Sequence, residues 1–204
     1  MAKSLLPSRP TFIIAVTMVL VALAIAAVAL SQRPTKGPAG SGTALIGGPF
    51  TMVDGTGKGV TEKNFKGRYA LYVFGFTFCP DVCPTEMQVI TAALKEMGAK
   101  GDKLTPVFVS VDPDRDTPQI VGQYVANFDP RWVGLTGTAE QLAAMAKAFH
   151  VFYQKVPNAK DPQNYEMDHS SIIYLMGPDG TFVKHFPYTT DAKVLASSLN
   201  SVLE

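Results

Sequence analysis

The sequence predicts an α/β domain of three layers, with helices on both faces of a central sheet, preceded by one N-terminal transmembrane helix. Two near-continuous apolar runs, Tyr69–Phe76 and Leu104–Asp112, have the composition of strands buried on both faces. Segments with helical spacing of apolar residues follow both runs, and a predicted hairpin and a last helix complete the chain. Strands that alternate with helices in this way are typical of a layered α/β domain.

The N-terminal region differs in composition from the rest of the chain. Residues 11–30 form an uncharged apolar stretch without Pro or Gly, and about 20 such residues can cross the ~30 Å hydrocarbon core of a bilayer as a helix. A cleavable signal peptide is the alternative, with Ala27 and Ala29 as its small residues, but its apolar region typically has only about 7–15 residues. We therefore predict an uncleaved anchor at 11–30, with residues 1–10 in the cytoplasm.

A segment of different composition follows the predicted anchor. Residues 31–48 are rich in Pro, Gly, Ser and Thr, and such a segment cannot bury enough surface to order itself, so it is predicted to be a flexible linker. Residues 49–204 are then long enough for one domain with its own core. The formal net charge of the chain is +1, which offers no electrostatic attraction to nucleic acid.

The expected strands share apolar runs or alternation, with Gly, Pro and Asp at their turns. They are two short strands around an Asp54-Gly55 turn within 49–61, buried strands at 69–76 and 104–112, a short strand within 131–137, and a hairpin within 170–187 that turns at Pro178-Asp179-Gly180.

The expected helices are marked at one or both ends by residues that favour the start or the end of a helix. They span about 84–98, about 117–128, 138–150 and 191–203. Pro84 is placed at the first position of the first helix, and Gly98 at its end. Asp116 and Thr117 are both N-cap candidates for the second helix, with Pro118 just inside it.

Both cysteines of the chain, Cys79 and Cys83, lie where a predicted buried strand ends and a helix begins. The positive end of a helix favours a thiolate over a thiol, and residues four apart can point to the same side. The pair is therefore suited to exchange electrons as a dithiol or to hold a soft metal ion. A purely structural disulfide is the third interpretation, but it would close too short a loop to add much stability.

A metal site needs a further ligand, and the chain has three histidines. His150 at the end of a helix and His185 in the hairpin are interpreted as structural or surface residues. His169 precedes a buried strand and is placed in a polar loop, where ligands often originate. Two thiolates and one imidazole form a soft ligand set that favours Cu(I). On the residues alone, a capping or hydrogen-bonding role in the loop is the favoured interpretation of His169, and a ligand role is the alternative.

Three aspartates, Asp112, Asp114 and Asp116, follow the second buried strand. They lack the glycine and the distal glutamate of a calcium-binding loop, so they are interpreted as a strand end, a Pro turn and a helix N-cap rather than a second metal site.

Three blocks, "FTFCPDVCPTEM", "VSVDPDRDTP" and "DHSSIIYLMGPDG", resemble the Sco/SenC family of copper-binding proteins, in the family's order and across essentially the whole predicted domain. The resemblance implies a thioredoxin-like fold with an inserted β-hairpin. It also implies copper ligands at Cys79, Cys83 and His169, with Asp81 supporting the loop electrostatically. One departure is Phe78, where many members carry histidine.

The resemblance implies a membrane-anchored copper chaperone that delivers copper, as Cu(I) or also Cu(II), to the subunit II copper centre of cytochrome c oxidase or prepares its thiols. The alternative is a thiol–disulfide oxidoreductase, with Cys79 and Cys83 as the redox dithiol. A peroxidase ranks last, because Pro80 stands three residues before Cys83, where a peroxiredoxin carries a threonine.

The predicted partners and location follow from the family resemblance and from the predicted anchor. The partners are cytochrome c oxidase subunit II and a periplasmic copper donor or thiol reductase, with the membrane contacted through residues 11–30. No Arg-rich, Ser-rich presequence precedes the span, which favours a bacterial inner membrane with the C-terminal domain in the periplasm over a mitochondrial inner membrane.

Overall fold

A computed structural model describes residues 45–158, 161 and 165–203 of the chain, which divides into the units 1–43 and 44–204. The predicted anchor at 11–30 and the linker up to residue 44 lie outside the described residues. No helix within the described ranges is long and apolar enough to cross a bilayer. At residues 45–48, the N–H of Gly47 donates to the carbonyl of Ala148 at 2.8 Å, so this part of the predicted linker packs on the domain.

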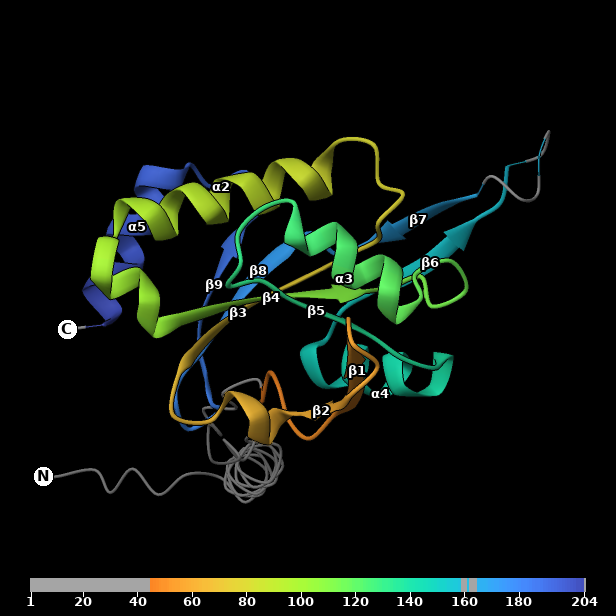
Figure 1. The fold of residues 1–204 in the computed structure, drawn as a ribbon, viewed down its shortest axis with the longest axis horizontal. Helices are drawn as coiled ribbons and strands as arrows, with labels where there is room; N and C mark the ends of the chain where they lie inside the picture. The colour runs from red at the N-terminus through yellow and green to blue at the C-terminus, as the bar shows by residue number, and fades with distance from the viewer. Residues whose placement is uncertain (1–44, 159–160, 162–164, 204) are drawn as a thin grey trace, which may run out of the picture. The chain divides into compact units, whose positions relative to one another are not determined.

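The domain is organised around a seven-stranded mixed sheet in the order β2-β1-β5-β4-β3-β8-β9 (Figure 1). Strands β3, β4 and β5 are parallel, whereas β1 and β8 pair antiparallel with β5 and β3. The parallel centre matches the buried strands that the sequence predicts. The strands are β1 (Thr51–Asp54), β2 (Gly59–Thr61), β3 (Tyr69–Gly75), β4 (Leu104–Ser110), β5 (Val133–Thr136), β8 (Ile172–Met176) and β9 (Phe182–Pro187).

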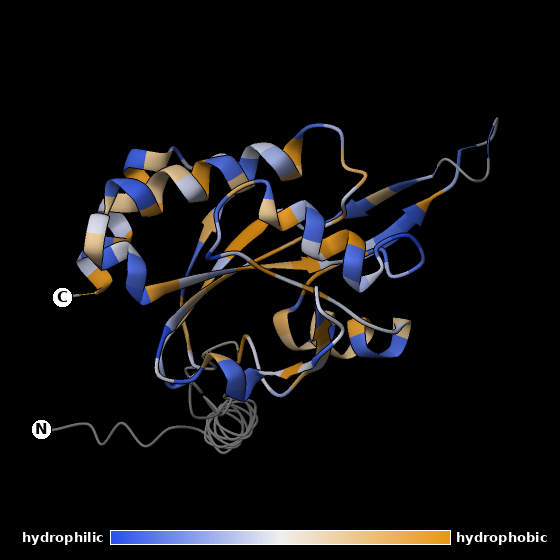
Figure 2. Ribbon diagram, viewed as in Figure 1, coloured by the Kyte–Doolittle hydropathy of each residue, from blue (hydrophilic) through white to orange (hydrophobic). Residues whose placement is uncertain are grey.

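Helices cover both faces of this sheet, as predicted (Figure 1). Alternate residues of β3 point to opposite faces: Leu71 packs with α2, α3 and α5, whereas Tyr72 packs with α4. Apolar residues dominate the central strands in Figure 2. The helices are α2 (Val82–Glu96), α3 (Pro118–Ala126), α4 (Ala139–Phe149) and α5 (Ala192–Val202), with short 3-10 helices η1 (Glu62–Phe65) and η2 (Gly98–Lys103).

Helix boundaries follow the predicted signals with two exceptions. Thr117 and Thr138 cap α3 and α4 through their hydroxyls, and Gly98 follows α2 with φ of 57°. Asp116 is not a cap, because its carboxylate is bonded elsewhere. Helix α2 begins at Val82 rather than at Pro84, which still lies in the first turn, where a missing N–H costs no intrahelical bond.

A second, two-stranded sheet flanks the passage that the sequence alone indicated to be rich in Pro and Asn. Strand β6 (Tyr153–Val156) pairs antiparallel with β7 (Glu166–His169), and Tyr153 is opposite His169. Figure 1 shows these strands extending away from the main sheet. His169 is therefore the last residue of a strand and not a loop residue, which corrects the expectation.

Candidate metal centre

The two cysteines lie between the carboxyl end of β3 and the first turn of α2. Cys83 is 2% exposed, Cys79 is half-buried, and both are free thiols. The backbone N–H of Cys83 donates to the sulfur of Cys79 at 3.4 Å, so the loop brings the two side chains together as the spacing predicts. Cys83 belongs to the first turn of α2, whereas Cys79 lies in the loop before the helix.

Gly75, the last residue of β3, makes room for Cys83. A Cβ atom at this position would lie 2.8 Å from the Cys83 sulfur and 3.0 Å from the ring of Phe108. A larger residue would push the sulfur away from the end of the strand. The glycine is therefore part of the site, although it contributes no ligand atom.

His169 reaches the cysteines from β7. Its Nε2 lies 3.8 Å from the Cys83 sulfur, and its ring lies edge-to-face with Phe76 at a centroid distance of 6.1 Å. The other nitrogen, Nδ1, is 3.2 Å from the carbonyl oxygen of Ser170. Because a carbonyl can only accept, a hydrogen bond in this contact needs the proton on Nδ1, which leaves Nε2 as the nitrogen that would bind a metal ion.

The separation of the Cys83 sulfur and His169 Nε2 suits two ligands of one ion. An ion about 2.3 Å from sulfur and about 2.0 Å from nitrogen, with about 120° between the bonds, holds these atoms roughly 3.7 Å apart. Among the described residues, no three Cys, His, Asp or Glu side chains already form a complete metal-binding group. A bound ion must therefore draw Cys79 together with a pair that is already at ligand spacing.

The two thiols have opposite pKa shifts because they share a hydrogen bond. The pKa of Cys79 is lowered, since the Cys83 side chain donates to its sulfur, as do the backbone N–H groups of Cys83 and Asp81. The pKa of Cys83 is raised by the same hydrogen bond and by burial. Cys79 is therefore the thiolate and the more accessible nucleophile of the pair.

We expect iodoacetamide to modify Cys79 before Cys83 in the reduced, metal-free chain. A lowered pKa keeps Cys79 ionised as the pH falls. The rate at which iodoacetamide modifies Cys79 should therefore stay high well below pH 9.0, the ordinary pKa of a thiol. Mass spectrometry of the two labelled positions at several pH values measures both rates. Equal rates, or a Cys79 rate that collapses just below pH 9, would contradict the assignment.

Glu86 lies one turn after Cys83 and is 3% exposed. Its Oε1 has no hydrogen-bond partner among the described residues. Burial, together with the negative charge of Cys79, raises the pKa of Glu86 to about 8. The side chain is therefore protonated near neutral pH, and it places an uncharged carboxyl beneath the cysteines.

Glu86→Gln should stabilise the metal-free reduced chain increasingly as the pH rises from 4.5 to about 8. The pKa of Glu86 is higher in the folded than in the unfolded parent, so the parent takes up a proton on folding between these pH values. Its free energy of unfolding therefore falls by about 1.4 kcal/mol for each pH unit across this window. Because the parent and the variant both contain Cys79, comparing their free energies of unfolding at the same pH largely cancels the contribution of Cys79 ionisation. Urea unfolding measures the difference, and a pH-independent difference would contradict the burial argument.

The other predicted residues have defined places. Asp81 precedes α2 without capping it through its side chain, and its Oδ1 is 3.4 Å from the Thr85 hydroxyl. His150 ends α4 with φ of 56°, and the His185 ring stacks on Phe182, so both are structural or surface residues as expected. Phe78 is 59% exposed beside the cysteine loop.

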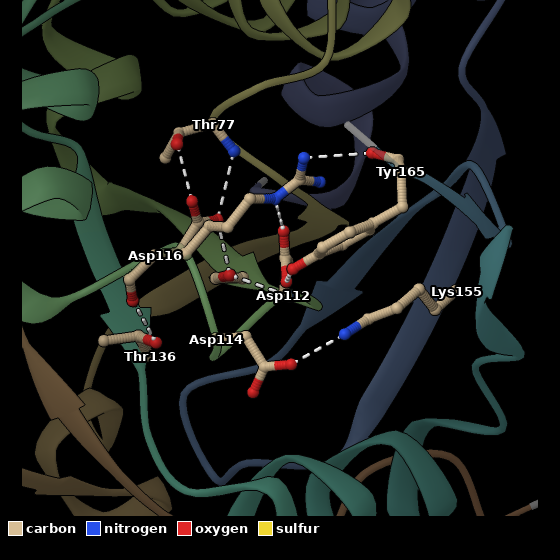
Figure 3. Close-up of polar contacts among 9 residues, drawn as sticks. Thr77, Asp112, Asp114, Asp116, Thr136, Lys155 and Tyr165 are labelled. Carbon is tan, nitrogen blue, oxygen red and sulfur yellow. Dashed lines mark hydrogen bonds and ion pairs between the residues drawn. The ribbon is translucent and has the colours of Figure 1, made fainter. Parts of the chain in front are cut away.

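The aspartate block at residues 112–116 differs in part from the expectation of a turn and a helix cap. Its residues do form a strand end and a turn, but Asp112 and Asp116 are 1% and 0% exposed. Figure 3 shows the polar contacts that their carboxylates make. Asp116 accepts hydrogen bonds from the Thr77 hydroxyl at 2.5 Å and the Ser110 hydroxyl at 2.6 Å. It thus connects the cysteine loop to the loop after β4. Polar residues directly after a buried strand are the only sequence signal for this role.

The chain was compared with protein-family models and with known proteins. The model described as SCO1/SenC matches residues 38–204. The human protein described as "Protein SCO1 homolog, mitochondrial" is 41% identical over 160 residues, which are 78% of this chain and 53% of that protein. The chain spans about half the length of the curated mitochondrial relatives that it matches first.

Solved structures support the same relationship. Bradyrhizobium japonicum ScoI with copper bound has a TM-score of 0.70 and 44% identity, covering 76% of this chain and 98% of that one. A structure described as identifying "a disulfide switch in BsSco, a member of the Sco family of cytochrome c oxidase assembly proteins" has a TM-score of 0.60 and 28% identity, covering 78% and 94%. The thioredoxin-like architecture that the sequence resemblance implied is thereby confirmed.

Proposed function

Because the chain belongs to the SCO1/SenC family, we propose that it is a membrane-anchored copper chaperone that holds copper through Cys79, Cys83 and His169. The observation that carries the proposal is the 3.8 Å separation of His169 Nε2 and the Cys83 sulfur, with Cys79 hydrogen-bonded beside them. Copper is the cargo of this site, and relatives such as Bradyrhizobium japonicum ScoI are solved with copper bound.

The ligand types suit copper in both oxidation states. Thiolates select Cu(I), and an imidazole nitrogen adds a ligand that Cu(II) prefers. The unequal burial of the sulfurs suits transfer, because Cys79 is half-buried while Cys83 is 2% exposed. An incoming thiolate would displace Cys79 first, and Cys83 and His169 would hold the ion until further acceptor ligands replace them.

The acceptor is proposed to be the subunit II copper centre of cytochrome c oxidase. BsSco is described as a member of a family of cytochrome c oxidase assembly proteins, which supports this choice. The apolar stretch 11–30 and the linker 31–48 support a domain tethered to a bacterial inner membrane on its periplasmic side. The tether would let the domain reach another membrane protein.

The proposal predicts that copper binding depends on the redox state of the pair. The purified reduced chain should bind one copper, whereas the chain with a Cys79–Cys83 disulfide should bind none at this site, since a disulfide lacks the two thiolates. Metal analysis after gel filtration of both forms measures the stoichiometry. Equal copper content in the reduced and the oxidised forms would rule out the cysteine pair as the binding site.

A thiol–disulfide oxidoreductase is the second candidate, favoured by the lowered pKa of Cys79. Its thiolate would attack a partner disulfide, and Cys83 would then release the reduced partner by forming the internal disulfide. Reduction of an acceptor disulfide that proceeds unchanged in His169→Ala, together with unchanged copper binding, would favour this candidate over the chaperone.

A further inference from the structure

We propose that Asp112, Arg115 and Tyr165, here called the Arg115 network, are positioning residues that set where His169 lies relative to the cysteines. The inference rests on the proposed function, because it takes His169 as a copper ligand. None of the three residues would touch the metal. Their effect would pass through the hairpin of β6 and β7, which carries His169, and for Arg115 also through its cation–π contacts with Phe76 and Phe78 beside the site.

The network holds Tyr165 at two points (Figure 3). The carboxylate of Asp112 accepts a hydrogen bond from the Tyr165 hydroxyl at 2.8 Å and another from Arg115 Nε. Arg115 Nη1 donates to the backbone carbonyl of Tyr165 at 2.9 Å, and its guanidinium carbon lies 3.7 Å from the centroid of the Tyr165 ring. The planar guanidinium thus fixes both the ring and the backbone of Tyr165.

Tyr165 directly precedes β7, and His169 ends that strand. At about 3.3 Å per residue, the two positions are roughly 13 Å apart along one short strand. β6 and β7 pair with each other and, within the described residues, not with the seven-stranded sheet. Contacts at the start of β7 therefore help to set the direction in which the hairpin presents His169.

A second contact holds the other strand of the hairpin. Lys155 of β6 pairs with Asp114 at 2.7 Å, and its Nζ lies 4.1 Å from the centroid of the Tyr165 ring (Figure 3). Lys155 is opposite Met167 in the register of the two strands. Both ions of this pair are partly exposed, so it contributes less than the Arg115 network.

The same loop also holds the cysteine side of the site. Asp116, one residue after Arg115, accepts from the backbone N–H and the hydroxyl of Thr77, which lies two residues before Cys79. Residues 112–116 therefore contact both the cysteine loop and the hairpin. A common support of this kind holds ligands from remote parts of the chain at fixed positions relative to each other.

The composition of the network favours orientation over stability as its role. The Asp112 side chain is 1% exposed and that of Arg115 16%, and Arg115 Nη2 is buried without a hydrogen-bond partner among the described residues. A buried ion pair often stabilises a fold no more than apolar packing of the same volume does. What it adds here is a defined direction for Tyr165, through bonds with strict geometry.

The experiment compares copper affinities of the purified full-length chain and its variants Arg115→Ala, Tyr165→Phe and His169→Ala. The matched control is Arg131→Ala, which removes another partly buried arginine–aspartate pair, with Asp129. The Cu(II) Kd should rise about 10–100-fold for Arg115→Ala, the range typical of residues that support a ligand histidine. Tyr165→Phe should show a smaller rise, and both variants should keep the parent Kd for Cu(I), which the thiolates dominate.

A metal-free measurement separates this proposal from the proposed function. The edge-to-face contact of His169 with Phe76 should shift the NMR resonances of the His169 ring, and Arg115→Ala and Tyr165→Phe should change that shift while Arg131→Ala does not. Parent-like His169 resonances in both network variants would overturn the positioning role, whatever copper does. The positioning role would also be overturned if Arg131→Ala lost as much Cu(II) affinity as the network variants do. It would be overturned as well if the network variants lost Cu(I) affinity to the same extent as Cu(II) affinity. Parent-like Cu(II) binding by His169→Ala would instead refute the ligand assignment.

Discussion

Replacing Cys83 with serine is expected to remove copper binding from the reduced chain. Cys83 is the buried sulfur that faces His169, and a hydroxyl is a poor ligand for a soft ion. Removing a residue that only supports a metal ligand can lower metal affinity by roughly 100-fold. Removing the ligand Cys83 itself should lower copper affinity by more than this. Competition with a chelator of known affinity measures it.

The control for Cys83→Ser is Thr91→Ser, a conservative change at another buried position of α2. It should keep the parent affinity, which separates loss of a ligand from disturbance of the helix. Copper retained by Cys83→Ser at parent affinity would contradict the assignment of this sulfur. Cys79→Ser should also abolish binding. Like Cys83→Ser, it would remove any dithiol chemistry as well, so neither variant separates the two candidate functions.

His169→Ala is expected to weaken Cu(II) binding by more than about tenfold, the lower end of what loss of a supporting residue costs, and to leave disulfide formation between the cysteines intact. The imidazole supplies one ligand atom but takes no part in joining the sulfurs. Copper competition and oxidation of the thiols by a disulfide reagent measure the two properties on the same sample.

His185→Ala is the matched control for this change, because His185 stacks on Phe182 in β9 and is exposed. It should alter neither property. If His169→Ala binds copper as tightly as the parent and as His185→Ala, then His169 is not a ligand, and the oxidoreductase candidate gains support.

The sequence was sufficient for the parts of the fold that have strong local signals. The apolar runs around Tyr72 and Val107 predicted the two buried central strands, and Thr117, Thr138 and Gly98 marked helix ends that the structure confirms. These signals are local because burial of strands and satisfaction of helix ends depend on neighbouring residues.

Long-range features were harder to predict. Strands β6 and β7 are short and largely polar, as Figure 2 illustrates, so no apolar alternation indicated a hairpin. The burial of Asp112 and Asp116 depends on Tyr165 and Thr77, whose proximity only the fold creates. An exposed turn and a buried carboxylate network have the same local sequence signature.

The cysteine pair was predictable from its position, whereas His169 was selected as a ligand only through the family resemblance. The spacing of Cys79 and Cys83 at the start of α2 placed them together without knowledge of the fold. The approach of His169 to Cys83 joins residues 86 positions apart, which no local pattern encodes.

X-ray absorption at the copper edge of the reduced, copper-loaded chain tests the central claim most directly. Two sulfur neighbours and one imidazole nitrogen are predicted, with the nitrogen contribution lost in His169→Ala. A spectrum with no imidazole contribution, or with only one sulfur neighbour, would contradict the proposal that Cys79, Cys83 and His169 meet at one ion.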